Sequence, residues 1–109
     1  HHLIDAQRLS LMQEHSILLN ISRGPVIDEQ ALAQALHQGQ IGGAGIDVYE
    51  CEPTVHPDLF TAPNCTLLPH IASATHETRT AIGELAASAI AGVLYQKDPS
   101  EIPNLISAF

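Results

Sequence analysis

The chain has 109 residues, which is enough for one small domain. It carries 12 acidic and 4 basic residues and a formal net charge of −8, which argues against binding to nucleic acid or to an anionic membrane surface, because both need basic patches. The sequence predicts neither a membrane-spanning segment nor a secretory leader. The 2 cysteines, Cys51 and Cys65, lack metal-ligand spacing and are too few for a disulfide scaffold, so we expect reduced thiols, no metal site and a cytoplasmic location.

The first part of the chain predicts a helix followed by a strand. Asp5 can cap a helix that runs to about Gln13. An apolar run over residues 16–21 predicts a buried strand, because such runs bounded by turn residues are typical of parallel sheets. Gly24-Pro25 then breaks the chain.

A second helix and a second strand follow. Asp28 can cap a helix, and the acidic Glu29 suits its first turn, where the helix dipole favours negative charge. Gly39 is placed to end this helix. Residues 41–48 predict the second strand, in which several glycines allow the close approach of a neighbouring segment.

The remaining chain contains a third strand and a long helix. Residues 49–64 carry proline and asparagine turn signals and predict an irregular loop. Residues 65–68 predict a short strand that Pro69 stops. Thr75 can cap a long alanine-rich helix to about Gln96, and the prolines of the tail predict coil.

The order of these elements predicts an α/β fold. Strands that alternate with amphipathic helices favour a parallel sheet with right-handed crossovers. The chain begins with a helix that should follow a strand, so we expect an N-terminal portion of the domain to precede His1.

Three chemically useful side chains follow the three predicted strands. Arg23 follows the first, Glu52 the second and His70 the third, and the carboxyl ends of parallel strands meet at one edge of the sheet. A guanidinium binds a carboxylate as a rigid fork, an imidazole moves protons near neutral pH, and a neighbouring carboxylate orients the ring. The three side chains together predict a site that binds a carboxylate beside a carbonyl or hydroxyl group and transfers one proton.

Each of these residues also has a plainer interpretation. An arginine in a turn and a glutamate before a proline are usually solvated surface residues, so Arg23 and Glu52 are weaker candidates from spacing alone than His70. Asp47 lies inside an apolar strand, where a buried carboxylate needs hydrogen-bond partners. It is therefore either a structural anchor or a further site residue.

Four sequence blocks resemble the signature blocks of the D-isomer-specific 2-hydroxyacid dehydrogenases. They are residues 20–29 (NISRGPVIDE), 44–50 (AGIDVYE), Glu52-Pro53 and 69–75 (PHIASAT). The run over residues 73–79 further resembles the glyoxylate/hydroxypyruvate reductase and 2-ketogluconate reductase branch of that family. The blocks occur in the family's order and spacing and cover nearly the whole chain.

The resemblance implies a role for each candidate residue. It implies that Arg23 binds the substrate carboxylate and polarises the keto group, that His70 is the general acid in reduction, and that Glu52 pairs with His70. It also implies NAD or NADP as the cofactor, with Asp47 at its nicotinamide end. The backbone that would line the same ring belongs to Ile21, Ser22, Arg23, His70, Ala72 and Ser73. Ala72 stands where the family commonly has glycine, and it adds a methyl group near the cofactor.

The resemblance further implies a C-terminal half of a Rossmann-like cofactor domain. Residues 1–74 would be part of the NAD(P)-binding domain, and residues 75–109 a helix and tail that return toward a substrate domain outside this chain. The family's glycine-rich phosphate loop would precede His1. We therefore expect the chain alone to be inactive and to self-associate through its exposed apolar surfaces, and the complete protein to be a homodimer.

The function implied is reduction of a small 2-keto acid, of the glyoxylate or hydroxypyruvate type, by NAD(P)H. Two alternatives stay open at this point. One is another D-2-hydroxyacid specificity, such as that of a phosphoglycerate dehydrogenase. The other is a non-enzymatic binding module like the NAD(H)-sensing corepressors that resemble this family.

Overall fold

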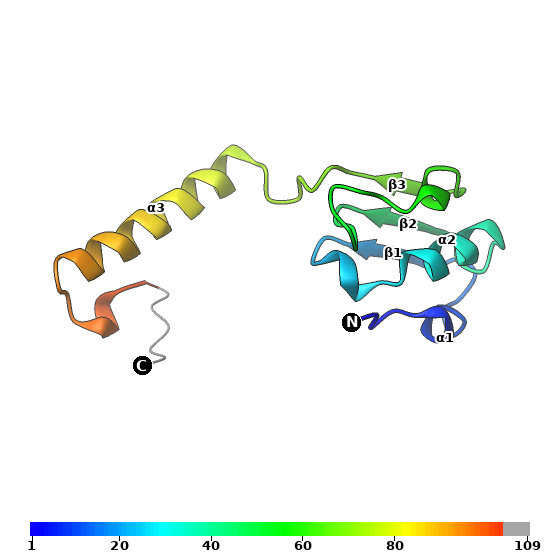
Figure 1. The fold of residues 1–109 in the computed structure, drawn as a ribbon, viewed down its shortest axis with the longest axis horizontal. Coiled ribbons are helices and arrows are strands. Elements are labelled where there is room, and N and C mark those ends of the chain that lie inside the picture. The colour runs from blue at the N-terminus through cyan, green and yellow to red at the C-terminus, as the bar shows by residue number, and fades with distance from the viewer. Residues whose placement is uncertain (104–109) are drawn as a thin grey trace. The chain divides into compact units, whose positions relative to one another are not determined.

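A computed structural model of the chain describes residues 1–103 and divides it into two units after Ala72. The first unit holds a three-stranded sheet and two helices, α1 (Ala6–Leu9) and α2 (Glu29–His37) (Figure 1). The second unit begins at Ser73 and holds the long helix α3 (His76–Leu94). Among the described residues, no helix is both long and apolar enough to cross a membrane.

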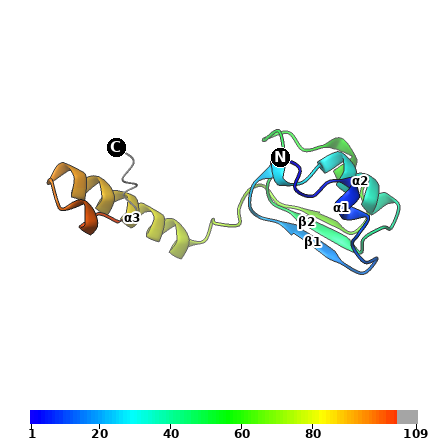
Figure 2. The ribbon, with the colours of Figure 1, turned by 90° about the horizontal axis from the view of Figure 1, so that it is seen from below.

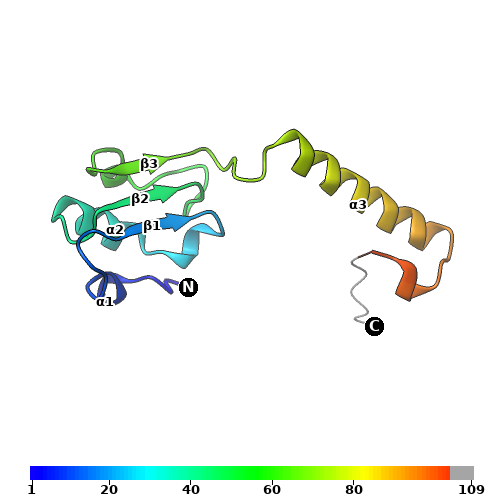
Figure 3. The ribbon, with the colours of Figure 1, turned by 180° about the vertical axis from the view of Figure 1, so that it is seen from behind.

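The sheet is parallel throughout, as predicted. Its strands β1 (Ile17–Asn20), β2 (Gly43–Ile46) and β3 (Cys65–Leu67) lie side by side in the order β1-β2-β3 (Figure 3). The strand β2 is therefore central, with a hydrogen-bonded neighbour on each side. The parallel arrangement brings the carboxyl ends of all three strands to one edge of the sheet, and this confirms the α/β prediction.

Both helices of the first unit cover the same face of the sheet (Figure 2). They are α1 (Ala6–Leu9) and α2 (Glu29–His37), and they bury Leu9, Leu32 and Leu36 completely or nearly so. Burying a leucine side chain contributes roughly 1.5–3 kcal/mol. This one layer of helices therefore supplies the hydrophobic core that holds the sheet in place.

Within residues 1–72 no helix covers the opposite face of the sheet. The side chains of Ile17, Leu19 and Ile21 point from it at every second position and are 70%, 70% and 69% exposed. They line a hollow of about 650 Å³ together with backbone and side chains of β2 and β3. A strand that is apolar on both faces but covered on one matches a sheet that normally lies between two layers.

The first helix is shorter than the sequence predicts. The prediction extended it to about Gln13, but α1 ends at Leu9. The hydroxyl of Ser10 donates to the carbonyl oxygen of Gln7 at 2.7 Å, and turns follow as far as the start of β1. Serine competes in this way with the regular backbone hydrogen bonds of a helix.

Other boundaries also differ by a few residues. Of the predicted strand over residues 41–48, only Gly43–Ile46 form the strand β2, and the predicted irregular loop contains a 3₁₀ helix at Pro57–Phe60. Another 3₁₀ helix, Pro99–Glu101, lies in the tail that was expected to be coil. Residues 104–109 of that predicted tail lie outside the described residues.

The second unit consists mainly of α3 (His76–Leu94), two residues shorter than predicted. Thr75 caps it as expected, because its Oγ1 accepts from the backbone N–H of Thr78 at 3.2 Å. Gly92 faces Ile102, and a Cβ at Gly92 would lie 2.9 Å from the Cγ1 of Ile102. The large apolar side chains that α3 exposes are Ile82, Leu85, Ile90, Val93 and Leu94.

Gly24 allows the turn after β1 to lie directly against the backbone that follows β2. A Cβ at Gly24 would lie only 1.9 Å from the carbonyl carbon and oxygen of Tyr49. Neither atom can move without disturbing the segment that leads to Glu52. This contact brings the turn that carries Arg23 close to the loop that carries Glu52.

We predict that Gly24→Ala destabilises the protein by about 1–3 kcal/mol, because the added methyl overpacks against backbone. The measurement is urea-induced unfolding of the parent and variant. Gly83→Ala is the matched control, since nothing lies within 4 Å of the Cβ it would add. Alanine in a helix interior is favoured over glycine by about 1 kcal/mol, so the control should be neutral or stabilising. A Gly24→Ala variant as stable as the parent would refute the close contact.

Candidate active site

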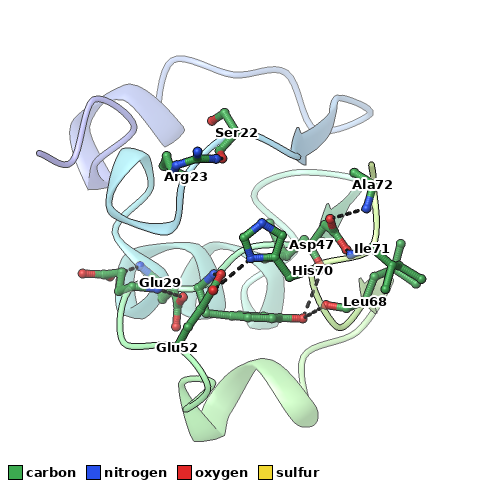
Figure 4. Close-up of polar contacts among 12 residues, drawn as sticks. Ser22, Arg23, Glu29, Asp47, Glu52, Leu68, His70, Ile71 and Ala72 are labelled. Atoms are coloured by element: carbon green, nitrogen blue, oxygen red, sulfur yellow. Dashed lines mark hydrogen bonds and ion pairs between the residues drawn. The ribbon is translucent and has the colours of Figure 1, made fainter. Parts of the chain in front are cut away.

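His70 and Glu52 form a direct pair at the carboxyl edge of the sheet (Figure 4). The Nδ1 atom of His70 lies 2.9 Å from Oε2 of Glu52, and the other carboxylate oxygen accepts from the backbone N–H of Tyr49 at 3.0 Å. A carboxylate accepts hydrogen bonds, so the proton of a neutral His70 ring belongs on Nδ1. The Nε2 atom is then the ring nitrogen available to a ligand.

Glu52 is held in its charged form. The hydrogen bonds from His70 and from the backbone N–H of Tyr49 lower the pKa of Glu52 below its usual value, and the positive charges of His70 and Arg23 act in the same direction. The side chains of the pair are 48% and 37% exposed, for His70 and Glu52 respectively. A ligand can therefore approach the pair without any movement of the core.

Tyr49 forms hydrogen bonds both to Glu52 and to the segment that leads to His70. Its backbone N–H holds Glu52, and its buried hydroxyl donates to the carbonyl oxygen of Leu68 at 2.7 Å. Burial raises the pKa of Tyr49, so the phenol keeps the proton that it donates. Leu68 precedes Pro69 and His70, and the bond therefore fixes the chain where it approaches the imidazole.

His70 itself has a left-handed backbone conformation, with φ of 55°. This conformation costs on the order of 1 kcal/mol in a residue other than glycine. Hydrogen bonds on both sides of His70 offset that cost: the Leu68 carbonyl oxygen before it accepts from Tyr49, and the N–H groups of the two residues after it donate to Asp47.

Asp47 anchors the chain after His70. It is 1% exposed, and its two carboxylate oxygens accept from the backbone N–H groups of Ile71 at 2.7 Å and Ala72 at 2.8 Å. Burial alone would raise the pKa of Asp47, but these two hydrogen bonds bring it below its usual value. Each carboxylate oxygen can accept a second hydrogen bond, so Asp47 retains acceptor capacity.

Arg23 lies in a separate turn after β1. The buried side chain of Asn20 shapes that turn by accepting from Ser22 and donating to the carbonyl oxygen of Arg23. The guanidinium of Arg23 is exposed and donates to the carbonyl oxygen of Ser22, as Figure 4 shows. The structure thus joins Glu52 to His70 directly, whereas Arg23 influences Glu52 only through its charge.

The remaining predicted site residues lie in three different places. Ile21 is exposed on the open face of the sheet, and Ala72 is held through its backbone by Asp47. Ser73 belongs to the second unit of the chain.

A pocket of about 370 Å³ adjoins the pair of His70 and Glu52, and its lining also includes Pro53 and Phe60. Small-molecule sites in proteins commonly have a volume of this order.

Sequence reasoning missed Glu29 as a buried group. We assigned it only to the first turn of a helix, where the helix dipole favours it, but it is 5% exposed and accepts hydrogen bonds from the backbone of the loop after β2. Its position was nevertheless a signal, because Glu29 precedes Leu32 and Leu36 at helical spacing and therefore shares their buried face. An acid on the apolar stripe of a helix needs partners from another segment.

Comparison with known proteins places the chain in one family. Residues 1–72 match the family described as "D-isomer specific 2-hydroxyacid dehydrogenase, NAD binding domain". A glyoxylate reductase of Thermococcus onnurineus (strain NA1) is 49% identical over 87 residues, which are 80% of this chain and 26% of that protein.

Two solved structures extend this similarity. One is the NADPH-dependent glyoxylate/hydroxypyruvate reductase of Sinorhizobium meliloti, in complex with citrate. It is 42% identical with a TM-score of 0.79, and the match covers 84% of this chain and 29% of the reductase. The D-mandelate dehydrogenase of Rhodotorula graminis is 37% identical with a TM-score of 0.84, over 97% of this chain and 31% of that one.

The chain thus spans between a quarter and a third of the length of these relatives, at 26%, 29% and 31%. The match to the family covers most of the chain and all of the sheet. Its parallel α/β fold and its sequence blocks agree with that match. The chain belongs to the D-isomer-specific 2-hydroxyacid dehydrogenases, and its residues 1–72 match their NAD-binding domain.

Proposed function

We propose that this chain is the C-terminal part of the cofactor domain of an NAD(P)-dependent reductase of small 2-keto acids, of the glyoxylate or hydroxypyruvate type. The observation that carries this proposal is the pair in which Glu52 holds Nδ1 of His70 at 2.9 Å and leaves Nε2 for a substrate. The Thermococcus onnurineus and Sinorhizobium meliloti relatives are a glyoxylate reductase and a glyoxylate/hydroxypyruvate reductase, and they support the choice of substrate.

The carboxyl end of the sheet fits the amide end of a nicotinamide. The hollow on the open face of the sheet reaches this end at Ile21, Asp47 and Leu68, and Asp47 can accept further hydrogen bonds. An apolar wall with one acceptor suits a flat ring that carries an amide donor. The residues that we propose to hold NAD or NADP are Ile21, Ser22, Arg23, Asp47, His70, Ala72 and Ser73. When bound, the cofactor supplies the hydride that the keto carbon accepts.

The residues of this chain perform the binding and the proton transfer. Arg23 exchanges its contact with the Ser22 carbonyl for the substrate carboxylate, and its charge stabilises the negative charge that develops on the keto oxygen. His70 donates a proton from Nε2 to that oxygen while the carbon gains a hydride, so that the C=O group becomes CH–OH. Glu52 keeps the ring oriented through Nδ1, so that Nε2 is the nitrogen that donates this proton.

The nearest second candidate is another D-2-hydroxyacid specificity. The similarity to a D-mandelate dehydrogenase favours this candidate, because mandelate is larger than glyoxylate. A phosphoglycerate specificity belongs to the same class. A corepressor-like binding module is not favoured, because the named relatives are enzymes.

We further propose how the chain is used in the complete protein. Residues 1–74 belong to the cofactor domain, and residues 75–109 return toward a substrate domain. The apolar side chains on the open sheet face and on α3 support burial against the rest of a homodimeric enzyme. The chain alone is then inactive. The free thiols of Cys51 and Cys65 are compatible with a cytoplasmic location.

The proposed activity predicts that the full-length protein oxidises NADH or NADPH when glyoxylate or hydroxypyruvate is added. In His70→Gln, kcat should fall roughly 10²–10⁴-fold, because the general acid is lost. The Kd for NAD(P)H should stay unchanged, because we propose that His70 lines the cofactor through its backbone and not its side chain. His37→Gln is the control, since His37 is exposed on α2. A substrate panel that includes phenylglyoxylate and 3-phosphohydroxypyruvate separates the alternative specificities.

Two results would contradict this proposal. One is an inactive full-length protein that binds another protein only when NAD(H) is present, as a corepressor would. The other is a His70→Gln variant as active as the parent. Turnover by residues 1–109 alone would contradict the claim that the chain is inactive.

Asp47 has two tasks under this proposal, since it holds the Ile71–Ala72 backbone and faces the cofactor. Its pKa is lowered by folding, so it stabilises the folded state fully above the unfolded pKa of about 3.9, and this contribution is lost as pH falls through the folded pKa. Asp47→Asn should therefore be less stable than the parent near neutral pH. Its stability should also decline less steeply than that of the parent below about pH 4.

Two measurements test Asp47→Asn. One is urea unfolding between about pH 3 and pH 7, in steps of about one pH unit, and the other is amide hydrogen exchange. Exchange at Ile71 and Ala72 should accelerate, because asparagine offers one acceptor oxygen in place of two. Asp58→Asn is the control, because Asp58 is exposed. Parallel pH profiles for Asp47→Asn and the parent would show that these hydrogen bonds do not depend on the charge.

A further inference from the structure

A buried carboxylate on α2 closes the loop that carries Glu52. Oε1 of Glu29 accepts from the backbone N–H of Glu50 at 2.7 Å, and Oε2 accepts from the backbone N–H of His56 at 3.0 Å. Glu29 is 5% exposed, and Figure 4 shows it beside the Glu52 segment. One side chain thus bonds to the chain on both sides of Glu52.

The contact with Glu50 is reciprocal. Oε1 of Glu50 accepts from the backbone N–H of Glu29 at 2.8 Å, while Oε2 of Glu50 lies 2.8 Å from Nε2 of His2. The N-terminus of α2 and the start of the loop therefore exchange two hydrogen bonds of the charge-assisted kind. Such an exchange fixes the distance between the two segments as well as their orientation.

The loop between these contacts is short and closed by its own hydrogen bond. The backbone N–H of Thr54 donates to the carbonyl oxygen of Cys51 at 2.9 Å, and Glu52 lies in the turn between them. Glu29 joins the base of this loop, and Glu52 lies at its tip. A loop held at both of its ends has few ways to move its tip relative to the sheet.

We propose that Glu29 is a positioning residue for the proton-transfer pair, because its carboxylate joins both ends of the Glu50–His56 loop and so holds Glu52 at hydrogen-bond distance from His70. This inference rests on the proposed function, since it assigns Glu29 a role in the same reaction. Glu29 contacts neither the substrate nor His70, and it acts through Glu52.

The two backbone donors need the two acceptor oxygens of a carboxylate. Glutamine has the same shape, but it offers one acceptor oxygen and turns an NH₂ group toward the other backbone N–H. Aspartate keeps the charge on a side chain that is one methylene shorter. Glu29→Gln therefore releases one end of the loop with almost no change in volume.

The first test is a double-mutant cycle in the full-length protein with Glu29→Gln, Glu52→Gln and the double variant. Loss of the loop geometry should lower kcat on the order of 10–100-fold in Glu29→Gln, with little change in the KM for NAD(P)H. The double variant should be no slower than Glu52→Gln, because Glu29 acts only through Glu52. Multiplied losses in the double variant would overturn the proposal.

The second test needs no activity, so it separates failure of this inference from failure of the proposed function. Carbon-13 NMR follows the titration of the Glu52 carboxyl, whose pKa is lowered by the hydrogen bond from His70, by the Tyr49 N–H and by the charges of His70 and Arg23. In Glu29→Gln the pKa of Glu52 should rise toward its usual value as these contacts weaken. An unchanged titration would overturn the proposal even if the enzyme is active.

Asp28→Ala is the matched control. Asp28 caps the same helix by accepting from Ala31, and its loss weakens the N-terminus of α2 without removing the Glu29 contacts. This control should leave the Glu52 titration and the cycle unaffected. Thermal unfolding checks that each variant is folded. If Glu29→Gln is not folded, Glu29→Asp takes its place, with the same expected and contradicting results.

Discussion

The geometry of the candidate site depends on one interaction, the acceptance of two backbone N–H groups by the buried carboxylate of Asp47. It ties the segment after His70 to the end of the central strand β2, and β2 itself is held on both sides by β1 and β3. The segment that carries the imidazole of His70 is therefore hydrogen-bonded to the end of the central strand, which has a neighbour on both sides. Buried carboxylates are costly without partners, so this interaction is strong only while both N–H groups remain in place.

The same principle recurs in the other acids near the site. Glu52 accepts from the Tyr49 backbone, and Glu29 accepts from the backbone at both ends of the loop after β2. An acidic side chain can hold an irregular segment in this way where no strand or helix satisfies its backbone. Part of the excess of acidic residues in this chain is therefore structural, although from composition alone we used it only as an argument against binding to nucleic acid or to an anionic membrane.

The sequence was sufficient to predict the parallel α/β order and the residues that follow each strand, because both depend on local periodicity and on turn residues. The pairing of Glu52 with His70 was also expected, and the structure has it. The end of α1 was wrong, because the contact of Ser10 with the preceding turn is a choice between two local hydrogen bonds that periodicity does not record. The contacts of Glu29 and Tyr49 were missed because they join segments that are distant in the sequence. Glu29 and Glu50 are 21 residues apart, and Tyr49 and Leu68 are 19 residues apart.

The open face of the sheet has a thermodynamic consequence. Ile17, Leu19 and Ile21 expose about 70% of their surface in the folded chain, so unfolding adds little to their contact with water. The heat capacity change of unfolding comes mainly from newly exposed apolar surface. The 109-residue chain should therefore have a smaller heat capacity change per residue than an ordinary domain, and a flatter dependence of stability on temperature. When another layer covers that face, the curvature typical of a complete α/β domain should return.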